Sequence, residues 1–154
     1  MVSEIQRERV RAHIETGLKE GATLVTGGAH APAEQSKGYF VLPTVLAVDS
    51  SKASPAQNEI FGPVLTVIPF DTEDEAIRIA NDSIYGLGGA VFAGSDEEGV
   101  RIAMKIKTGQ VNINGGQWNV NAPFGGYKQS GTGRENGVFG FEEFLQIKSL
   151  QLKA

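Results

Sequence analysis

The sequence predicts an α/β fold, with a mostly parallel sheet, flanking helices and a strand at its C-terminal edge. From residue 64 onward, short β-rich runs alternate with amphipathic helical segments in the order strand, helix, strand, helix, strand. Such alternation is typical of parallel strands joined by right-handed crossover helices, because parallel neighbours cannot be joined by a tight turn. The positions of the helices are indicated independently by three capping boxes.

In a capping box, a Ser or Thr side chain and a Glu or Gln three residues later satisfy main-chain N–H groups at a helix start. The first box, Ser3 with Gln6, predicts a helix to about residue 20, stopped by Gly21. Its apolar stripe consists of Val10, Ile14 and Leu18.

The second box opens at Thr72, and we expect residues 76, 79 and 80 of its helix to face inward. The third opens at Ser95 on a helix with apolar residues at 100, 103, 104 and 106, closed by Gly109. The runs expected to form strands span residues 23–26, 40–48, 64–70, 89–93, 110–114 and 144–152.

Composition narrows the class of protein. With 154 residues, 40% hydrophobic and 21% charged, the chain is typical of one soluble globular domain. A net charge of -4 argues against a nucleic-acid partner, which requires a basic face. No apolar run is long enough to span a bilayer, the N-terminus is too polar for a signal peptide, and there is no cysteine. We therefore expect a cytoplasmic setting and no membrane partner.

Two glycine-containing motifs stand out. The first is Glu-Ile-Phe-Gly-Pro-Val at residues 59–64, and the second is Pro-Phe-Gly-Gly-Tyr-Lys-Gln-Ser-Gly-Thr-Gly-Arg-Glu at residues 123–135. Glycine lets a main chain approach a flat ligand closely, which suits a binding loop. In this order, the motifs resemble the cofactor motif and the C-terminal motif of the NAD(P)-dependent aldehyde dehydrogenase superfamily. The resemblance covers essentially the whole chain, but only about the last third of a family member.

The first motif offers two candidate cofactor-binding residues. An ionised carboxylate accepts two hydroxyl hydrogen bonds at once, which suits the vicinal diol of a ribose. The resemblance implies that Glu59 holds the nicotinamide ribose and that Phe61 packs against the nicotinamide ring of NAD or NADP. An extended chain would place both side chains on the same side. The alternatives are a solvated surface glutamate and an ordinary core phenylalanine.

Trp118 and Phe124 lie on a glycine-rich loop after the run 110–114. Large apolar side chains on a loop are costly unless they line something. The resemblance implies that they wall a channel for an aromatic or aliphatic aldehyde. The alternative is simple packing under the loop.

The end of the second motif, Arg134 and Glu135, is the last candidate site. The resemblance implies that Glu135 belongs to a relay of water and protons and that Arg134 makes structural ion pairs. A salt-bridged helix start is the alternative. The two isolated histidines, His13 and His30, predict no metal site.

The absence of cysteine limits the chemistry. Aldehyde oxidation in this family begins with attack of a cysteine thiolate on the carbonyl, so the resemblance implies a parent enzyme but an inactive chain when alone. The general base, the oxyanion-stabilising asparagine and the adenosine-binding half of a family member would lie upstream. We therefore favour a truncated or split fragment of an oxidoreductase that oxidises an aldehyde to a carboxylic acid.

Two other functions stay open. One is a non-catalytic assembly or binding module derived from an aldehyde dehydrogenase, and the other is a different enzyme that uses Ser130 or Glu135. The resemblance also implies residues 1–143 as a partial catalytic domain with the nicotinamide-ribose and substrate-channel loops. Residues 144–154 are then a C-terminal strand that joins subunits into a homo-oligomer.

Overall fold

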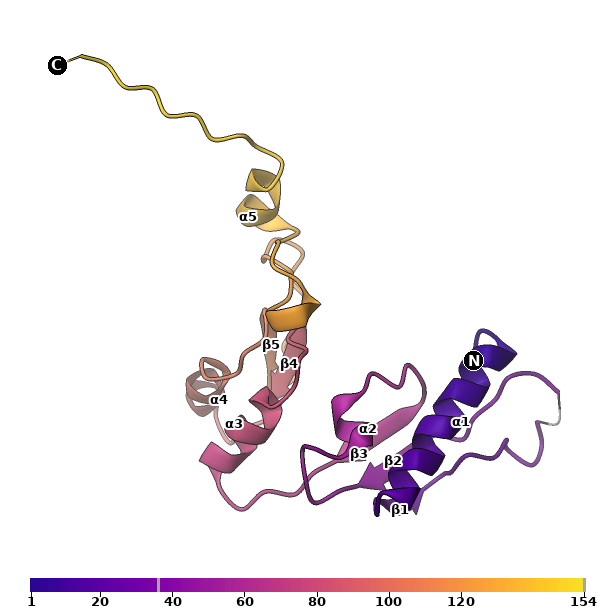
Figure 1. Ribbon diagram of the computed structural model, residues 1–154. Coiled ribbons are helices and arrows are strands. Elements are labelled where there is room, and N and C mark those ends of the chain that lie inside the picture. Colours follow the sequence, from indigo (N-terminus) through magenta and orange to yellow (C-terminus); the bar gives the residue numbers. More distant parts are fainter. Residues whose placement is uncertain (36, 154) are drawn as a thin grey trace. The chain divides into compact units, whose positions relative to one another are not determined.

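The computed structural model describes residues 1–35 and 37–153. The chain forms two compact units, Met1–Ala76 and Ile77–Ala154, where the sequence suggested one (Figure 1). Each unit has its own small sheet. The α/β class is confirmed, since helices and strands intersperse between Glu4 and Ile113. None of the described helices is both long and apolar enough to cross a membrane.

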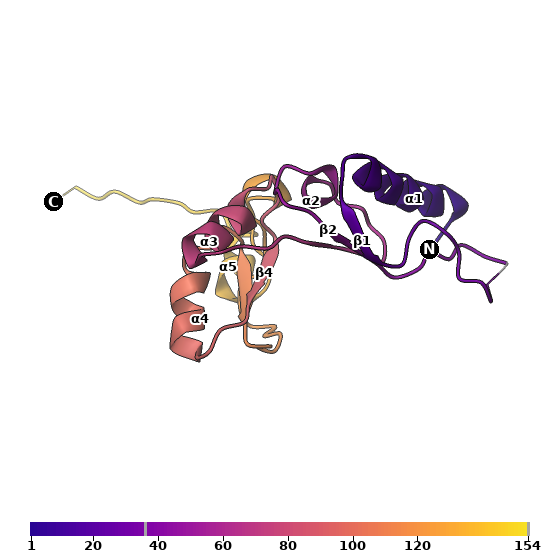
Figure 2. The same cartoon turned by 90° about the horizontal axis from the view of Figure 1, so that it is seen from below.

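The first unit packs helix α1 (Glu4–Lys19) and the short helix α2 (Ser54–Gln57) with three strands, β1 (Thr23–Thr26), β2 (Thr44–Ala47) and β3 (Val64–Val67). Figures 1 and 2 show α1 lying alongside β1 and β2. The central strand β2 pairs parallel with β3 but antiparallel with β1, so this sheet is only partly parallel. Residues 27–35 and 37–43 of the β1–β2 connection form no crossover helix, so the two strands can run in opposite directions.

The core of this unit forms where the predicted stripe of α1 meets the loops around the sheet. Val10 and Ile14 are completely buried and cluster with Val41 and Ile60, while Leu18 is half-buried against them. This cluster matters for function because Ile60 belongs to the first motif. The core therefore holds that motif against α1.

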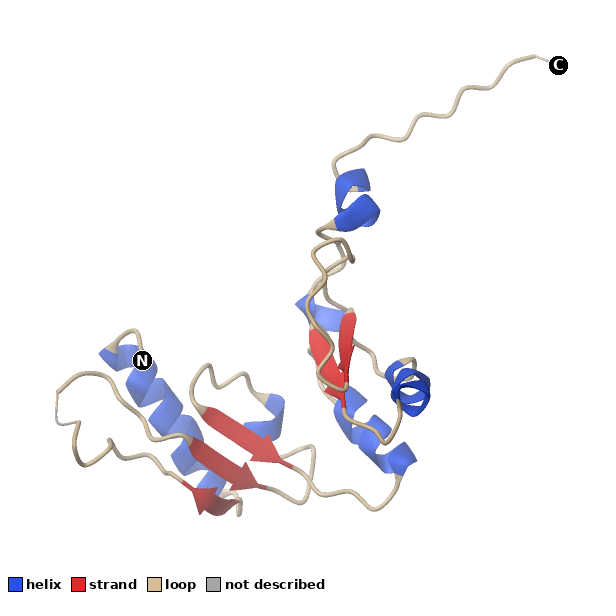
Figure 3. Ribbon diagram, turned by 180° about the vertical axis from the view of Figure 1, so that it is seen from behind, coloured by secondary structure: helices blue, strands red, loops and turns tan. Residues whose placement is uncertain are grey.

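Helix α3 (Glu73–Asn81) spans the boundary between the units. In the second unit, β4 (Gly88–Val91), helix α4 (Asp96–Ala103) and β5 (Gln110–Ile113) follow in order, and β4 and β5 pair in parallel (Figure 3). The predicted strand–helix–strand crossover is thus confirmed. The chain continues through a 3₁₀ turn, η1 (Lys128–Ser130), and helix α5 (Gly137–Glu142), which the sequence did not predict.

The Ser or Thr half of each capping box is confirmed, whereas the carboxylates of Glu75 and Glu98 accept the N–H groups of Asp71 and Gly94, one residue before each cap. The hydroxyls of Ser3, Thr72 and Ser95 each accept a hydrogen bond, at 3.2 Å, from the main-chain N–H three residues later. Of the apolar residues expected on the third helix, Val100 and Met104 are exposed, and the buried position is Gly99. The helix ends at Ala103 and not at Gly109. On α3, Ala80 is likewise exposed.

Two strand predictions are also corrected. The run 40–48 forms a strand only over Thr44–Ala47, and residues 144–153 contain no strand in this chain. Apolar side chains of that tail, including Phe144 and Ile147, are exposed. A strand requires a ladder partner for its N–H and C=O groups, and none of the described residues supplies one for this segment.

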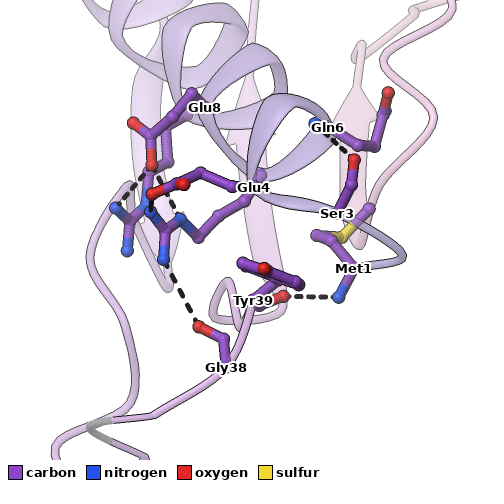
Figure 4. Close-up of polar contacts among 9 residues, drawn as sticks. Met1, Ser3, Glu4, Gln6, Glu8, Gly38 and Tyr39 are labelled. Carbon is purple, nitrogen blue, oxygen red and sulfur yellow. Dashed lines mark hydrogen bonds and ion pairs between the residues drawn. The ribbon is translucent and has the colours of Figure 1, made fainter.

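The first turn of α1 is tied to the loop before β2 by polar contacts (Figure 4). Arg7 pairs with Glu4 at 2.8 Å and with Glu8 at 2.7 Å, donates to the carbonyl of Gly38 at 3.3 Å and lies over the ring of Tyr39. The hydrogen bond from Arg7 holds the pKa of Glu8 below its ordinary value, and the same bond raises the pKa of Arg7. These contacts orient the start of α1, and the first motif packs against this helix.

Candidate functional site

The first motif lies on the loop between α2 and β3. Glu59 is exposed, and within residues 1–35 and 37–153 it has no hydrogen-bond or ion-pair partner. It lines a surface hollow of about 310 Å³ together with Asn58 and Phe61. An exposed carboxylate without an internal partner keeps its full acceptor capacity for a ligand.

Phe61 lies on the same hollow, but not for the reason expected from the sequence. Its φ is 58°, in the left-handed region, so the motif is not an extended strand with alternating side chains. Phe61 as a residue is 70% exposed, which excludes an ordinary core phenylalanine in this chain. An exposed aromatic next to an unpaired carboxylate suits a ligand that has both a flat ring and hydroxyl groups.

Gln6, on the first turn of α1, holds this loop and was not recognised as a site residue from the sequence. Its side-chain amide donates to the carbonyl of Phe61 at 3.0 Å and to that of Ile60 at 3.4 Å. Gly62 lies so close to the helix that a Cβ there would be 2.6 Å from a methyl of Val10. From the sequence, Gln6 was predicted only as a capping-box residue, and its 54-residue separation from Ile60 hides the contact.

The loop after β5 and the start of the second motif bring together the two aromatic residues expected to line a channel. The rings of Trp118 and Phe124 meet edge to face, with centroids 5.0 Å apart. They line a hollow of about 190 Å³ with residues of β5 and of the loop that follows it. Trp118 is 53% exposed, so much of its ring remains available to a ligand.

Glu135 is placed beside Phe124 by the main chain. The two residues form an isolated antiparallel bridge, with N–H to carbonyl distances of 2.8 and 2.6 Å. Both also line another hollow of this unit, of about 360 Å³, together with the glycine-rich segment 131–133. This hollow beside Glu135 is called the second hollow below. Glu135 is exposed at this hollow.

Arg134 departs from the expected ion pairing. Its guanidinium Nη1 donates to the carbonyls of Gly126 at 3.0 Å and Gly133 at 2.8 Å, and the group lies over the ring of Tyr127. Guanidinium has several donors in a fixed plane, so one side chain can close a loop by binding several carbonyls. Arg134 thus shapes the wall of the second hollow.

Ser130 is occupied in a structural contact. Its hydroxyl oxygen accepts the N–H of Gly86 at 3.0 Å, within a segment whose main chain also bonds to residues 84 and 86. Lys128 adds hydrogen bonds to the carbonyls of Asn81 and Ser83. These contacts support the second motif, and they favour a structural role for Ser130 over that of a nucleophile.

The predicted residues therefore fall into two groups. Glu59 and Phe61 share one hollow in the first unit, whereas Trp118, Phe124 and Glu135 lie together in the second. The first group could hold a nicotinamide and its ribose, and the second presents an apolar wall with one carboxylate. No thiol is available in either group, since the chain has no cysteine.

Comparison with known proteins gives one consistent result. A family model described as "Aldehyde dehydrogenase family" matches residues 1–150. A 3-succinoylsemialdehyde-pyridine dehydrogenase of Pseudomonas sp. is 48% identical over 150 residues, which is 97% of this chain and 31% of that protein. A putative aldehyde dehydrogenase of Staphylococcus saprophyticus is 47% identical over 151 residues, 97% of this chain and 32% of that protein.

Similar solved structures include two that were determined with NAD+ bound. An aldehyde dehydrogenase of Mycobacterium tuberculosis complexed with NAD+ superposes with a TM-score of 0.93 at 49% identity, covering 99% of this chain and 32% of that one. A mutant of aldehyde dehydrogenase C from Pseudomonas syringae, complexed with NAD+ and octanal, gives 0.90 at 48% identity, with 95% and 30% covered. The chain thus spans about a third of the length of these relatives.

Proposed function

The chain belongs to the aldehyde dehydrogenase family, and on that premise we propose that it forms the C-terminal part of the catalytic domain of an enzyme that oxidises aldehydes to carboxylic acids. In this proposal Glu59 and Phe61 hold the nicotinamide ribose and ring of NAD or NADP. Trp118 and Phe124 form part of the aldehyde channel, and Glu135 belongs to a proton and water relay. The nicotinamide, when bound, supplies the hydride acceptor, and residues outside these 154 supply the thiol.

The observation that carries this proposal is the exposed, unpaired carboxylate of Glu59 in a hollow that an aromatic ring also lines. The Glu59 carboxylate is exposed and has no hydrogen-bond or ion-pair partner in the described part of the chain, so both of its oxygens can accept from a ligand. It also lines a hollow beside an aromatic ring that is itself exposed. Similar chains that bind NAD+ support the choice of cofactor.

The substrate proposal rests on the second unit. The edge-to-face pair of Trp118 and Phe124 presents a largely apolar surface, which favours an aliphatic or aromatic aldehyde over a strongly charged one. The complex of the Pseudomonas syringae relative with octanal supports an apolar substrate. We also propose that the enzyme is cytoplasmic.

Nicotinamide mononucleotide tests the cofactor proposal in this chain, because it contains the ring and its ribose but no adenosine. Titration monitored by NMR is expected to shift the main-chain amide signals of residues 59–62. Glu59→Gln is expected to weaken binding about tenfold, because one charge-assisted hydrogen-bonding group is lost.

Glu15→Gln is the matched control, since it removes the same charge from an exposed position on α1. This variant should bind nicotinamide mononucleotide as the unaltered chain does. Equal affinities for all three proteins, or signal shifts that avoid residues 59–62, would remove Glu59 from the proposed site.

One observation favours the alternative function, an assembly module. The C-terminal tail exposes Phe144, Ile147, Leu150 and Leu152, each more than four-fifths accessible. We propose that this tail adds as a strand to a second copy of the chain, which would give a homo-oligomer. Sedimentation over a concentration series should then show self-association that is lost on deletion of residues 146–154. Association that survives the deletion would place the interface elsewhere.

A further inference from the structure

Two asparagines in this chain precede a glycine, Asn114 and Asn136, and both are exposed. In an Asn-Gly pair, the main-chain nitrogen of the glycine can attack the side-chain carbonyl of the asparagine and close a five-membered imide. Glycine has no Cβ to obstruct that approach. The two pairs are chemically identical, so the surroundings of each asparagine side chain decide how readily it reacts.

The side chain of Asn114 is held at both ends. Its Oδ1 accepts the N–H of Ala93 at 2.9 Å, and its Nδ2 donates to Oδ1 of Asp96 at 2.9 Å. These bonds connect the end of β5 to the start of α4. The Asn114 side chain must break both before its carbonyl carbon can turn toward the nitrogen of Gly115.

The side chain of Asn136 has no such restraint. It precedes helix α5 without making a side-chain capping hydrogen bond, and no partner for it occurs in residues 1–35 or 37–153. Gly137 is the first residue of that helix, where helix geometry leaves the N–H without an internal acceptor. The helix has only six residues, so its first turn is expected to open readily.

We propose that Asn136 is a site of spontaneous deamidation and that Asn114 is protected by its two hydrogen bonds. The nitrogen of Gly137 bonds to Cγ of Asn136, the Cγ–Nδ2 bond breaks, and the proton of the peptide nitrogen leaves with ammonia. Water then opens the imide to aspartate or isoaspartate. Nothing is oxidised or reduced, and each event adds one negative charge to the chain.

The modification would act on the wall of the second hollow. Asn136 follows Glu135, whose main chain pairs with Phe124, and its carbonyl accepts the N–H of Gly140 at 3.0 Å. Isoaspartate inserts one extra carbon into the main chain between residues 136 and 137. The start of α5 and the position of Glu135 are therefore expected to change together.

The surroundings of the glycines alone predict the opposite order. A Cβ at Gly115 would meet nothing within 4 Å, whereas one at Gly137 would lie 2.5 Å from the carbonyl oxygen of Asn121. The relative rates of the two sites thus separate control by side-chain hydrogen bonds from control by main-chain crowding.

The test incubates the folded 154-residue chain in mildly alkaline buffer and follows its tryptic peptides by mass spectrometry. Cleavage after Arg134 and Lys148 isolates Asn136 as the only asparagine of its peptide. Asn136 is expected to convert at least about tenfold faster than Asn114, the factor that one modest hydrogen bond represents. After unfolding in urea, the two rates should approach each other.

Asp96→Ala supplies a matched variant, because it removes one of the two partners of Asn114 and leaves Asn136 unaltered. Deamidation at Asn114 should accelerate in this variant, while that at Asn136 should keep its rate. Conversion of Asn114 as fast as Asn136 in the unaltered folded chain would overturn the proposal. So would a folded Asp96→Ala variant with an unchanged rate at Asn114, or an Asn136 that reacts only after unfolding.

Discussion

Phe61 has a main-chain conformation that its neighbours impose. A non-glycine residue at φ 58° is strained by about 1 kcal/mol or more relative to the right-handed region. Such strain persists where surrounding contacts hold it, and it is frequent at ligand sites. Here the contacts are the amide of Gln6 on the carbonyl of Phe61 and the close approach of Gly62 to Val10.

This arrangement makes Gln6 a positioning residue for the proposed cofactor site. Gln6→Glu keeps the size of the side chain but replaces its donor by a carboxylate, which would repel the carbonyls of Ile60 and Phe61. We expect faster hydrogen exchange at residues 60–62 in the free chain and about fivefold or greater weakening of nicotinamide mononucleotide binding.

Gln35→Glu introduces the same charge at an exposed loop position and serves as the control. Its exchange pattern at residues 60–62 should match that of the unaltered chain. If Gln6→Glu weakened binding without altering exchange in the free chain, Gln6 would act on the ligand directly and not through the loop.

The second motif depends on how closely its loop packs against the start of β5. A Cβ on Gly109 would lie 1.6 Å from the carbonyl oxygen of Gly125, so no side chain fits there. The N–H of Gly109 and that of Tyr127 both donate to the carbonyl of Gly86, which ties three segments together. Glycine at position 109 therefore allows the close approach to Gly125 that sets the position of the neighbouring Phe124.

Gly109→Ala is expected to destabilise the second unit by about 3 kcal/mol, the upper range for forcing extra volume into a packed site. Trp118, the only tryptophan, lies in this unit and reports its unfolding by fluorescence in a urea series.

Gly88→Ala is the control, because a Cβ there meets nothing within 4 Å and the residue lies in the neighbouring strand β4. Its unfolding midpoint should stay close to that of the unaltered chain or rise slightly. Similar midpoints for the two alanine variants would mean that the 109–125 approach does not hold the motif.

At the scale of the whole molecule, the lack of any cysteine limits which reaction the chain can catalyse. Without a thiolate, the 154 residues are expected to show no aldehyde oxidation with NAD+ or NADP+ at any chain concentration. Replacing the matched segment of the Mycobacterium tuberculosis relative by this chain should give an active chimera, given their 49% identity and TM-score of 0.93.

Spectrophotometric assay of reduced-cofactor formation checks both statements. A chimera with Glu59→Gln should lose activity relative to the unaltered chimera, and one with Glu15→Gln should retain it. Turnover by the isolated chain that scales with its concentration and survives repeated purification would contradict the requirement for an external thiol. A folded but inactive chimera would instead count against the proposed enzymatic role of these residues.

The sequence was sufficient to predict a structural element where the interactions that form it join residues close together in the chain. The capping hydroxyls of Ser3, Thr72 and Ser95 act on N–H groups three residues away, so their sequence spacing alone identified the helices. The apolar pattern likewise placed the core of α1 at Val10 and Ile14. On α4 the apolar pattern missed the buried position, Gly99, because glycine carries no side chain for a hydrophobic pattern to detect.

The sequence by itself determined the family motifs, the three capped helices, the crossover from β4 to β5 and the lack of a thiol. The tertiary structure decided the antiparallel pairing of β1, the left-handed conformation of Phe61, the role of Gln6 and the carbonyl contacts of Arg134. The reason is the range of the interactions. Caps and periodic patterns act within a few residues, whereas loop shapes and site geometry depend on contacts such as that between Gln6 and Phe61, 55 residues apart.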